Sequence, residues 1–582
     1  MSTDMDLKES DSVQDQTESG VVLPADSPSA RPSTPKDEHH IEAAILPARF
    51  WTLSLGVLLG LFLSMIDTSI VATSLYNIGV EFEALEEVNW VALAYTLAYL
   101  GCAVVFARIS DIVGRRDAFI AAYIIFFAFS LACGFSANLE QLIAFRALQG
   151  IGGSGLYALT MIILPELSPP HLAQHIGALV GMVIALSGVL GPVLGGLLTH
   201  YTSWRWVFWI KYVLPFSICA TLLTPPSGPV GFVSLIIFIF TWPKAEHLPT
   251  IERRAWKELD YFGSFLAIAA AVLVIFAFQT AGTSSNGGWK TAMFIAPLLC
   301  GLLAWGLLVG WQVFIQHRLS ERFAPAFPIN LFRNRVYTTA ALNTLFIGFP
   351  YLLLIYSIPL RIQVVSGKSA LVGGVMLLPM LGASALGSML AGKFNSVKNY
   401  VFETLFVGSC LMTLGCGLLV TLDHAPDDAK LLGFITFCGL GFGLTVASST
   451  MLSTIEAPIR DFAPAQGILS QMRLLGGSLG IATSSALLNQ RIIEYLSGTL
   501  TPFEIATIGG PDSHLSDSQW AAVRYTYSEA FRVDMKVATG ISALGVISTI
   551  GAFQKHRLLV AEQRAALVRE EAARRQAQSD QQ

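Results

Sequence analysis

The sequence predicts an all-α membrane protein with fourteen membrane-spanning helices. Of its 582 residues, 53% are hydrophobic and only 13% are charged, and its mean hydropathy is +0.59. A soluble domain has too little interior for so many apolar side chains. Apolar runs of about 20 residues, the length that crosses ~30 Å of hydrocarbon, recur between residues 50 and 555. These runs are long, rich in Gly and without strand-like alternation, so we expect α-helices.

The chain begins and ends with polar segments. The first 45 residues are rich in Ser, Asp, Glu and Pro and lack the basic-then-apolar pattern of a cleaved signal peptide. We therefore assign residues 1–48 to a disordered cytoplasmic tail and expect the first span to act as an uncleaved signal. Residues 555–582 have mixed charge and are expected to form a solvated helix that frays, as a second cytoplasmic tail.

The membrane spans follow in order along the chain. We expect them at 51–76, 89–107, 118–136, 141–164, 172–198, once within 205–242, and at 261–280, 291–315, 337–360, 370–391, 401–421, 431–452, 464–488 and 528–553. With both tails inside, the inner loops contain 14 Lys and Arg residues and the outer loops seven, as the positive-inside rule favours. Counting 205–242 as two spans would place 11 of the 14 on the wrong side.

Two charged side chains lie inside apolar spans. Asp67 stands in LSMIDTSIV of the first span, and Arg146 stands in FRALQGIGGSG of the fourth, one turn before Gln149. A lone carboxylate in a bilayer costs several kcal/mol, whereas a guanidinium cannot lose its charge and needs acidic, carbonyl or water partners. Asp67 is either a structural partner of a neighbouring helix or a proton-sensitive gating carboxylate, and Arg146 marks a transport path.

The short loop after the second span reads ARISDIVGRR. It places Asp111 three residues before Gly114 and four before Arg115. Acidic and basic groups in so short an inner turn predict either a charge lock between helix ends, broken as the halves of the molecule move, or a plain positive-inside anchor.

Glycine-rich segments recur in three spans. In the fourth span the glycines after Gln149 are expected to provide a smooth packing face. The fifth span, SGVLGPVLGG, is expected to be a close-packed, kinked helix through Gly188, Gly191, Pro192 and Gly195. The thirteenth, QMRLLGGSLG, repeats the charged-then-glycine pattern with Arg473, which suggests an internal duplication around a central site.

These motifs resemble those of the major facilitator superfamily. ARISDIVGRR is similar to its signature between spans two and three, FRALQGIGGSG to that of span four, and SGVLGPVLGG to the antiporter signature of span five. With MIDTSIV in span one, PLRIQVVSGKSALVGG followed by MLLP at 359–379, and fourteen spans, the chain resembles the fungal fourteen-span drug:proton antiporter branch over residues 50–555.

The resemblance implies a major-facilitator fold of two six-helix bundles with a substrate cavity between them. The divisions would be an N-terminal bundle at 49–243, a loop at 244–260, two linker helices at 261–316, a loop at 317–336 and a C-terminal bundle at 337–554. It also implies a monomer in the cell membrane, or in the vacuolar membrane. The implied partners are a small-molecule substrate, protons and the lipid bilayer, with no nucleic acid, cofactor or metal.

Roles for individual residues also follow from the resemblance. Arg146 would assist proton transfer, Asp111 and Arg115 would form the gating lock, and the Gly191-Pro192 pair would set the antiporter bend. The first position of the lock signature, commonly Gly, is Ala107 here, and Ser110 stands beside Asp111.

An aromatic cavity would suit a flat, apolar natural product. The candidate contact residues are Tyr95, Gln149, Tyr157, Asn343, Phe346, Tyr351, Tyr356 and Arg473. For the aromatic members, helix packing or an interfacial position is the alternative role.

Two other functions compete with export. One is uptake of an iron chelate or another nutrient, although TWPKAEHLPT stands where sugar porters have a PESPR-like sequence. The other is a membrane sensor or scaffold without transport, which would require a larger soluble segment than the chain has. An enzyme is not expected, because HExxH, GxSxG and P-loop patterns are absent, and the seven cysteines form no CxxC pair.

Residues 204–242 are the irregular part of the span pattern. The run contains Lys211, Pro215 and PPSGP at 225–229, and it is too long for one helix and too short for two with a turn. WRWVFWI and GPVG resemble the two halves of the family's sixth span, W-R-W-x-F-x-x-N-x-P-x-G. We hypothesise that residues 211–227 are translated intron, because Lys211 to Ser227 can be encoded with splice-site sequences whose excision leaves one Asn codon.

Overall fold

The described part of the chain is almost entirely helical. The computed structural model describes residues 47–71, 74–83, 88–168, 173–210, 231–243, 255–283, 288–319, 327–368, 370–422, 427–458, 461–496 and 516–554, with a few single positions between and after them. These residues belong to one unit, Ile45–Gln582. The predicted all-α class is therefore confirmed. The hypothesised intron at 211–227 lies outside the described residues.

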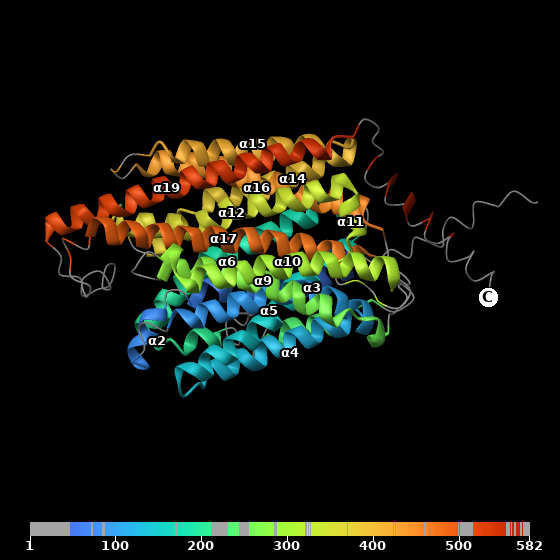
Figure 1. Cartoon of the computed structure of the whole chain (residues 1–582), viewed down its shortest axis with the longest axis horizontal. Coiled ribbons are helices and arrows are strands. Elements are labelled where there is room, and N and C mark those ends of the chain that lie inside the picture. Colours follow the sequence, from blue (N-terminus) through green and yellow to red (C-terminus); the bar gives the residue numbers. More distant parts are fainter. Residues whose placement is uncertain are drawn as a thin grey trace, which may run out of the picture. The chain divides into compact units, whose positions relative to one another are not determined.

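The first set of helices comes from the first half of the chain (Figure 1). It comprises α1 (Pro47–Ile70), the short α2 (Leu75–Glu81), α3 (Asn89–Val113), α4 (Arg115–Gly134), α5 (Leu139–Leu167), α6 (Ala173–Tyr201) and α8 (Gly231–Thr241). Helix α5 packs against α3, α4 and α1, and α1 packs in addition against α6 and α8. Helix α5 is thus surrounded by its neighbours, and most of its side chains are buried.

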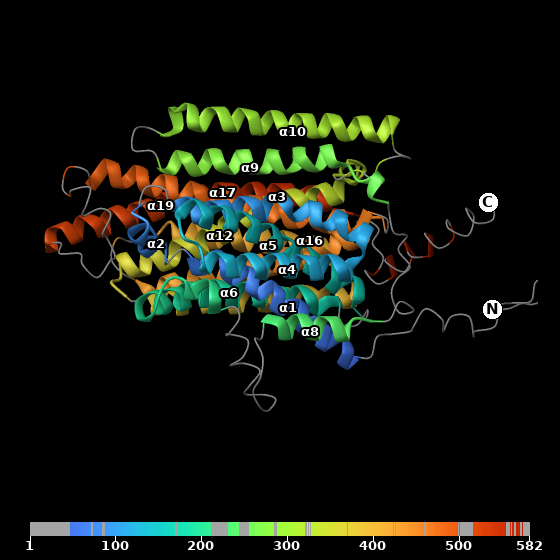
Figure 2. The same ribbon diagram turned by 90° about the horizontal axis from the view of Figure 1, so that it is seen from below.

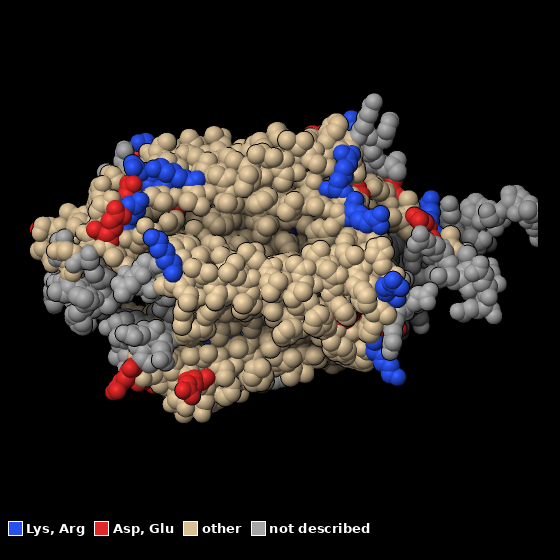
Figure 3. Space-filling view, in the orientation of Figure 1, with Lys and Arg blue, Asp and Glu red and all other residues tan. Residues whose placement is uncertain are grey.

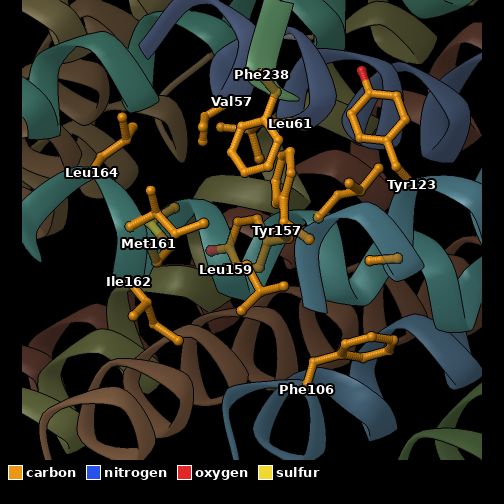
Figure 4. Close-up of a cluster of buried hydrophobic side chains, with 14 of the residues drawn as sticks. Val57, Leu61, Phe106, Tyr123, Tyr157, Leu159, Met161, Ile162, Leu164 and Phe238 are labelled. Carbon is orange, nitrogen blue, oxygen red and sulfur yellow. The ribbon is translucent and has the colours of Figure 1, made fainter. Parts of the chain in front are cut away.

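Apolar side chains fill the interior of this first set. Figure 4 shows part of this core, in which side chains from five helices meet. Val57 and Leu61 come from α1, Phe106 from α3 and Tyr123 from α4; the α5 members are Tyr157, Leu159, Met161, Ile162 and Leu164, and Phe238 comes from α8. Because α8 contributes Phe238 to this core, it belongs to the same set as α1 and α4.

The second set comes from the last half of the chain. It comprises α11 (Asn330–Arg333), α12 (Arg335–Val364), α13 (Ala370–Val375), α14 (Leu378–Val397), α15 (Val401–Leu419), α16 (Asp428–Glu456), α17 (Phe462–Leu496) and α19 (Asp517–Thr549). Helix α16 packs between α14 and α15, and α12 packs between α17 and α19. A separate apolar core lies among these helices.

Helices α9 (Tyr261–Thr283) and α10 (Ala292–Arg318) form a pair outside both sets. Figure 2 shows the pair on one side of the other helices, with α10 outermost. Helix α9 packs against α17 and α3, while α10 packs mainly against α9. Apolar residues on the outer face of α10 are exposed, including Leu299, Leu303 and Leu307, as expected for side chains that face lipid.

Contacts between the two sets run along two lines. On one line α6 packs against α14, α13 and α16; on the other α17 packs against α3 and α5. Helices from both halves of the chain therefore enclose the region between these lines, and two of the contacts discussed below, Arg108 with Asp461 and Arg473 with Tyr157, join the two sets.

Most of the predicted spans are present as helices. Twelve helices in the described ranges are long and apolar enough to cross a membrane, and they match every predicted span except those at 205–242 and 464–488. Helix α17 covers the predicted span at 464–488 without a break, but polar side chains interrupt its apolar sequence. These include the buried Gln466, Gln471 and Arg473. Of 205–242, the structure describes the short helix at 206–210 and α8.

Two span boundaries differ from the prediction. Helix α1 ends at Ile70 instead of continuing to residue 76, and the chain turns before α2. Helix α19 begins at Asp517, not at residue 528, because Ser516 and Gln519 form a capping box that satisfies the first backbone N–H groups. The first turns of α19 therefore lie before the apolar stretch from which the span was predicted.

Charged side chains gather at the ends of the helices. On the face drawn in Figure 3, Lys, Arg, Asp and Glu lie toward the two ends, with an uncharged band between them. A hydrocarbon layer excludes exposed charge, so this band is the part that faces lipid.

Candidate functional site

A buried ion pair joins α5 to α1. Arg146 Nη1 donates to Asp67 Oδ2 at 2.5 Å, and both side chains are almost fully buried. Either charge alone in this interior would carry a desolvation cost of several kcal/mol. The sequence predicts that Asp67 has either a structural or a functional role, and the structure establishes that it does bond to a neighbouring helix.

Arg146 also contacts a third helix, α3. Its Nε donates to the carbonyl oxygen of Val91 on α3 at 3.1 Å, and its Nη1 donates to Gln149 Oε1 at 2.9 Å. The guanidinium lies over the ring of Tyr95, 4.1 Å from the ring centre, and the Tyr95 hydroxyl donates to the carbonyl of Ser64 at 2.9 Å. Helices α1, α3 and α5 are thus joined at one polar centre within an apolar core.

A second ionic cluster lies where α3 meets α4. Arg115 Nη1 donates to Asp111 Oδ1 at 2.7 Å and to Ser110 Oγ at 2.6 Å, and Arg115 Nε donates to Glu166 Oε2 of α5 at 3.0 Å. Gly114 lies between the helices with a φ of 98°, a value that L side chains rarely adopt. Asp111 and Arg115 are therefore held together by the tight turn that the glycine permits.

This cluster extends to the second set of helices. The buried Arg108 of α3 contacts Asp111 Oδ2 through Nη1 and Asp461 Oδ1 through Nη2, each at 3.4 Å. Asp461 directly precedes α17. At the same place, a Cβ added to Gly467 would lie 2.9 Å from the Cβ of Ala107. The predicted charge cluster thus includes an ion pair between the two sets.

A smaller cluster lies at the opposite end of the first set. Glu81, at the end of α2, accepts from Arg205 Nη1 at 2.5 Å and from Trp204 Nε1 at 2.6 Å. Partial burial acts to raise the pKa of Glu81, but the bonds from Arg205 and Trp204 outweigh it and lower the pKa below its ordinary value. These bonds fix the start of the helix at 206–210 against α2.

Glycines in α5 and α17 allow neighbouring backbones to approach closely. A Cβ on Gly150 would lie 2.5 Å from the carbonyl oxygen of Tyr95, and one on Gly155 would lie 2.6 Å from Ala122 Cβ. In α17, a Cβ on Gly476 or Gly480 would collide with carbonyl oxygens of α12. The packing role predicted for these glycines is consistent with these approaches.

The residues predicted to bend α6 lie within a continuous helix. Gly191 packs against the side chain of Ser69 on α1, and a Cβ on Gly188 would lie 3.7 Å from Ile355 of α12. Gly195 is buried, and the side chain of Pro192 lies outside the described residues. Their role in a bend therefore remains a prediction.

The predicted substrate contacts fall into separate groups. Tyr95 and Gln149 lie against Arg146, and Tyr157 of α5 lies against Arg473 of α17, whose Nη1 donates to the Tyr157 hydroxyl at 3.4 Å. Tyr351 stacks on Phe442 within the second set.

Three further candidates lie apart from these groups. Asn343 donates to Ser409 Oγ at 2.8 Å and to the carbonyl of Gly545 at 3.1 Å, which is a packing role between α12, α15 and α19. The Tyr356 side chain is 41% exposed, and Phe346 is half-buried near Gly545.

Four charged residues were not predicted as site residues from the sequence: three in the ionic cluster and one, Asp534, apart from it. Arg108 and Glu166 belong to the ionic cluster, and Asp461 pairs with a residue 353 positions earlier. Asp534 of α19 is 3% exposed, with one carboxylate oxygen accepting from Ser484 Oγ at 2.5 Å and the other without a partner in the described residues. Asp534 lies inside the predicted span at 528–553, so the signal that singled out Asp67, a carboxylate within a span, was present for Asp534 as well.

Known proteins resemble this chain along most of its length. The Major Facilitator Superfamily model matches residues 57–285. The chain is 30% identical over 515 residues to the MFS-type transporter FPY5 of Fusarium mangiferae, covering 86% of this chain and 83% of that protein. It is 26% identical to the efflux pump roqT of Penicillium rubens, over 86% of this chain and 91% of the relative.

Bacterial and human proteins are also similar. The multidrug resistance protein 3 of Bacillus subtilis is 28% identical, over 80% of this chain and 85% of that protein. The crystal structure of the human organic anion transporter MFSD10 (TETRAN) matches with a TM-score of 0.50 at 14% identity, over 84% of this chain and 99% of that one, which establishes likeness of fold alone. The helices, the span pattern and these relatives together establish that the chain is a multi-pass membrane transporter, and not an enzyme, of the Major Facilitator Superfamily.

Proposed function

We propose that this transporter exports small amphipathic molecules in exchange for protons. The observation that carries the proposal is the buried pair of Asp67 and Arg146. A proton that binds Asp67 removes its negative charge and weakens its attraction for Arg146, whose own charge is permanent. Arg146 would then rely on the Val91 carbonyl and Gln149, and α1 would be freed from α5. Proton binding is thereby coupled to helix movement.

The ionic cluster at the ends of α3 and α17 would act as the gate. The pair of Arg108 and Asp461 joins the two sets of helices, while Asp111, Arg115 and Glu166 hold Arg108 in place from one side. Separation of the two bundles, residues 49–243 and 337–554, breaks this pair and opens the end where it lies. Helices α9 and α10 serve as the linker between the bundles.

The proposed orientation follows from the charges of the loops. Both tails and the ionic cluster lie on the cytoplasmic side of the cell membrane, where most Lys and Arg residues of the loops are found. One chain is the transporting unit. The relatives named as efflux pumps support the outward direction. Gly191 lets α6 pack closely on Ser69 of α1, and we place the antiporter movement of α6 at this contact.

Transport in cells tests the proposal. Cells that lack the chain are compared with cells that express it, using ethidium, pyrenebutyrate and neutral pyrenebutyrate methyl ester as probes, together with metabolite profiling and toxin-sensitivity panels. We expect expression to lower the retention of at least one probe, and we expect a protonophore to abolish the difference.

Matched variants locate the proton dependence. The neutral pair Asp67→Asn with Arg146→Gln is expected to eliminate the effect of the protonophore, whereas Asp427→Asn, at the exposed start of α16, should leave it intact. Unchanged retention and unchanged tolerance in expressing cells would contradict export. Greater accumulation of a probe or nutrient would instead favour uptake, and no flux of any kind would favour a sensor.

A further inference from the structure

Arg473 is a buried arginine whose charge no carboxylate balances in the described part of the chain. Its side chain on α17 is 6% exposed, and its Nη1 makes only a long bond of 3.4 Å to the Tyr157 hydroxyl. Its Nε is buried and has no partner among the described residues. By contrast, Arg108, Arg115 and Arg146 each pair with at least one carboxylate.

Other unsatisfied polar atoms lie near Arg473. The hydroxyl of Tyr351 on α12 lies within electrostatic reach of Arg473 and close to Ser384 of α14. The Tyr351 hydroxyl and Ser384 Oγ are both buried and lie next to each other, and neither makes a hydrogen bond of good geometry in the described ranges. Buried polar groups are nearly always paired in folded proteins, so the unpartnered Nε of Arg473, with these two hydroxyl groups nearby, indicates a site that another molecule completes.

These side chains lie where the two sets of helices meet. Tyr157 belongs to α5 of the first set, while Arg473, Tyr351 and Ser384 belong to the second. Ser384 faces α6, because a Cβ on Gly181 would lie 3.9 Å from its Oγ. A ligand bound here therefore touches both bundles, and its binding favours the conformations in which they enclose it.

We propose that Arg473 binds an acidic group of the transported molecule, such as a carboxylate or an enolate. A guanidinium keeps its charge and its planar donors match the two oxygens of a carboxylate. A ligand anion would supply the counter-charge that the helices lack, and the tyrosine rings would contact the apolar part of the ligand. This inference rests on the proposed export function and names the substrate class: amphipathic acids.

Equilibrium binding tests the inference without a proton gradient. The full-length chain in lipid nanodiscs is titrated with pyrenebutyrate, its methyl ester and pyrenebutylamine, and energy transfer from tryptophan to pyrene is measured against empty nanodiscs. We expect the acid to bind at least about tenfold more tightly than the ester or the amine, as loss of a charge-assisted hydrogen bond implies.

Substitutions assign this preference to Arg473. Arg473→Gln should reduce acid binding to the level of the ester, and Arg473→Lys should retain an intermediate preference, because it keeps the charge without the planar donors. Arg532→Gln, which removes an arginine that pairs with Glu529 near the surface, is the control and should bind like the native protein. Size-exclusion chromatography verifies that each variant is folded.

The outcomes separate this inference from the proposed function. Equal binding of the three probes, no binding of the acid, or an unchanged acid preference in both Arg473 variants would overturn it. Because no gradient is present, binding of the acid through Arg473 would stand even if proton-driven export failed. Conversely, proton-driven export of ethidium alone, with no acid binding, would support the proposed function and reject the acidic substrate class.

Discussion

The buried arginines differ in how their charge is balanced. Arg146 has a carboxylate, a backbone carbonyl, an amide and an aromatic ring, all inside the first set of helices. Arg108 shares two carboxylates that come from different sets. Among the described residues, Arg473 bonds only to a tyrosine hydroxyl, at long range. The same side chain therefore suits a fixed internal pair, a contact that can break, and a site for a ligand.

A double-mutant cycle measures the pair of Asp67 and Arg146. We expect Asp67→Asn alone to lower the free energy of unfolding by about 3–5 kcal/mol, because it leaves a buried guanidinium without its anion. Adding Arg146→Gln should recover much of this loss, since the remaining groups are neutral and can still bond to each other. Thermal unfolding in detergent provides the comparison. Additive losses in the double variant would mean that the two residues are not coupled.

Asp534 is expected to be replaceable at no cost to stability. Its carboxylate is buried, bonded to Ser484 on one oxygen and unpartnered on the other in the described residues. Asparagine has the same shape, keeps an oxygen for the Ser484 hydroxyl and has no charge to desolvate. We predict that Asp534→Asn unfolds at the same temperature as the native protein or higher. A marked loss of stability would indicate a favourable partner for the charged form.

At the scale of elements, Asp260 holds the linker helices together. Its Oδ1 accepts from the Gly263 backbone N at 2.7 Å and from Trp311 Nε1 at 2.9 Å, and its Oδ2 accepts from Gln312 Nε2 at 2.6 Å. The side chain of Asp260 therefore caps the first turn of α9 and also bonds α9 to α10. A Cβ on Gly263 would collide with this carboxylate, which explains the glycine at that position.

Loss of this carboxylate should loosen one helix locally. Asp260→Ala leaves two buried donors and the half-buried Trp311 Nε1 without this acceptor, and each buried donor is worth about 1–3 kcal/mol. Because α10 packs mainly on α9, we expect faster hydrogen exchange in α10 and little change in α12 or α5. Hydrogen exchange followed by mass spectrometry measures this by segment, with the exposed Lys290→Gln as control. Uniform acceleration across all helices would show that Asp260 stabilises the whole protein instead.

The sequence predicts the elements better than their contacts. Apolar length located twelve spans, and the short turn of Asp111 and Arg115 predicted either a charge lock or a plain anchor, because both features are local; the structure shows the two side chains paired. Asp461 pairs with Arg108 across 353 positions, and no local pattern predicts a bond of that separation. Asn343 was predicted as a polar substrate contact, which stays a prediction; its amide nitrogen bonds to Ser409 and Gly545, two partners that the sequence did not identify. A polar residue in an apolar helix indicates a partner without identifying it.

At the scale of the molecule, the bond of Arg108 to Asp461 links the two sets at one end. Asp461→Asn weakens this pair and should increase the time that this end spends open. A cysteine introduced at the buried Val104, beside Gly467, is expected to react faster with a maleimide when Asp461→Asn is present than when Asp461 is native. The native cysteines are replaced first, and Asp427→Asn serves as control. Equal reaction rates would exclude a gating role for the pair.

At the same scale, the predicted sixth span is described as two separate helical segments. The helix at 206–210 and α8 both pack against α4, but at different heights: Ser130 Oγ donates to the Phe208 carbonyl at 3.1 Å, and the Phe119 and Phe238 rings lie 4.5 Å apart. Residues 119 and 130 are about 16 Å apart along a helix at ~1.5 Å per residue. The two halves of a single membrane span would contact α4 at two different heights in the same way.

Replacing residues 211–227 with one Asn joins those halves into the sequence WRWVFWINGPVGFVSLIIFIFTW. In this shortened chain, Phe208 and Phe238 would be separated by about 21 Å of continuous helix, which reaches both contacts on α4 once side-chain length is allowed for. A single span also avoids placing Lys211 in the membrane. We therefore predict that the shortened chain accumulates to a higher level in the membrane, unfolds at a higher temperature and transports the same probes as the full chain, measured side by side. Sequencing the cDNA provides the independent measurement. Loss of expression or transport in the shortened chain, or transcripts that uniformly retain these codons, would establish residues 211–227 as a working part of the protein.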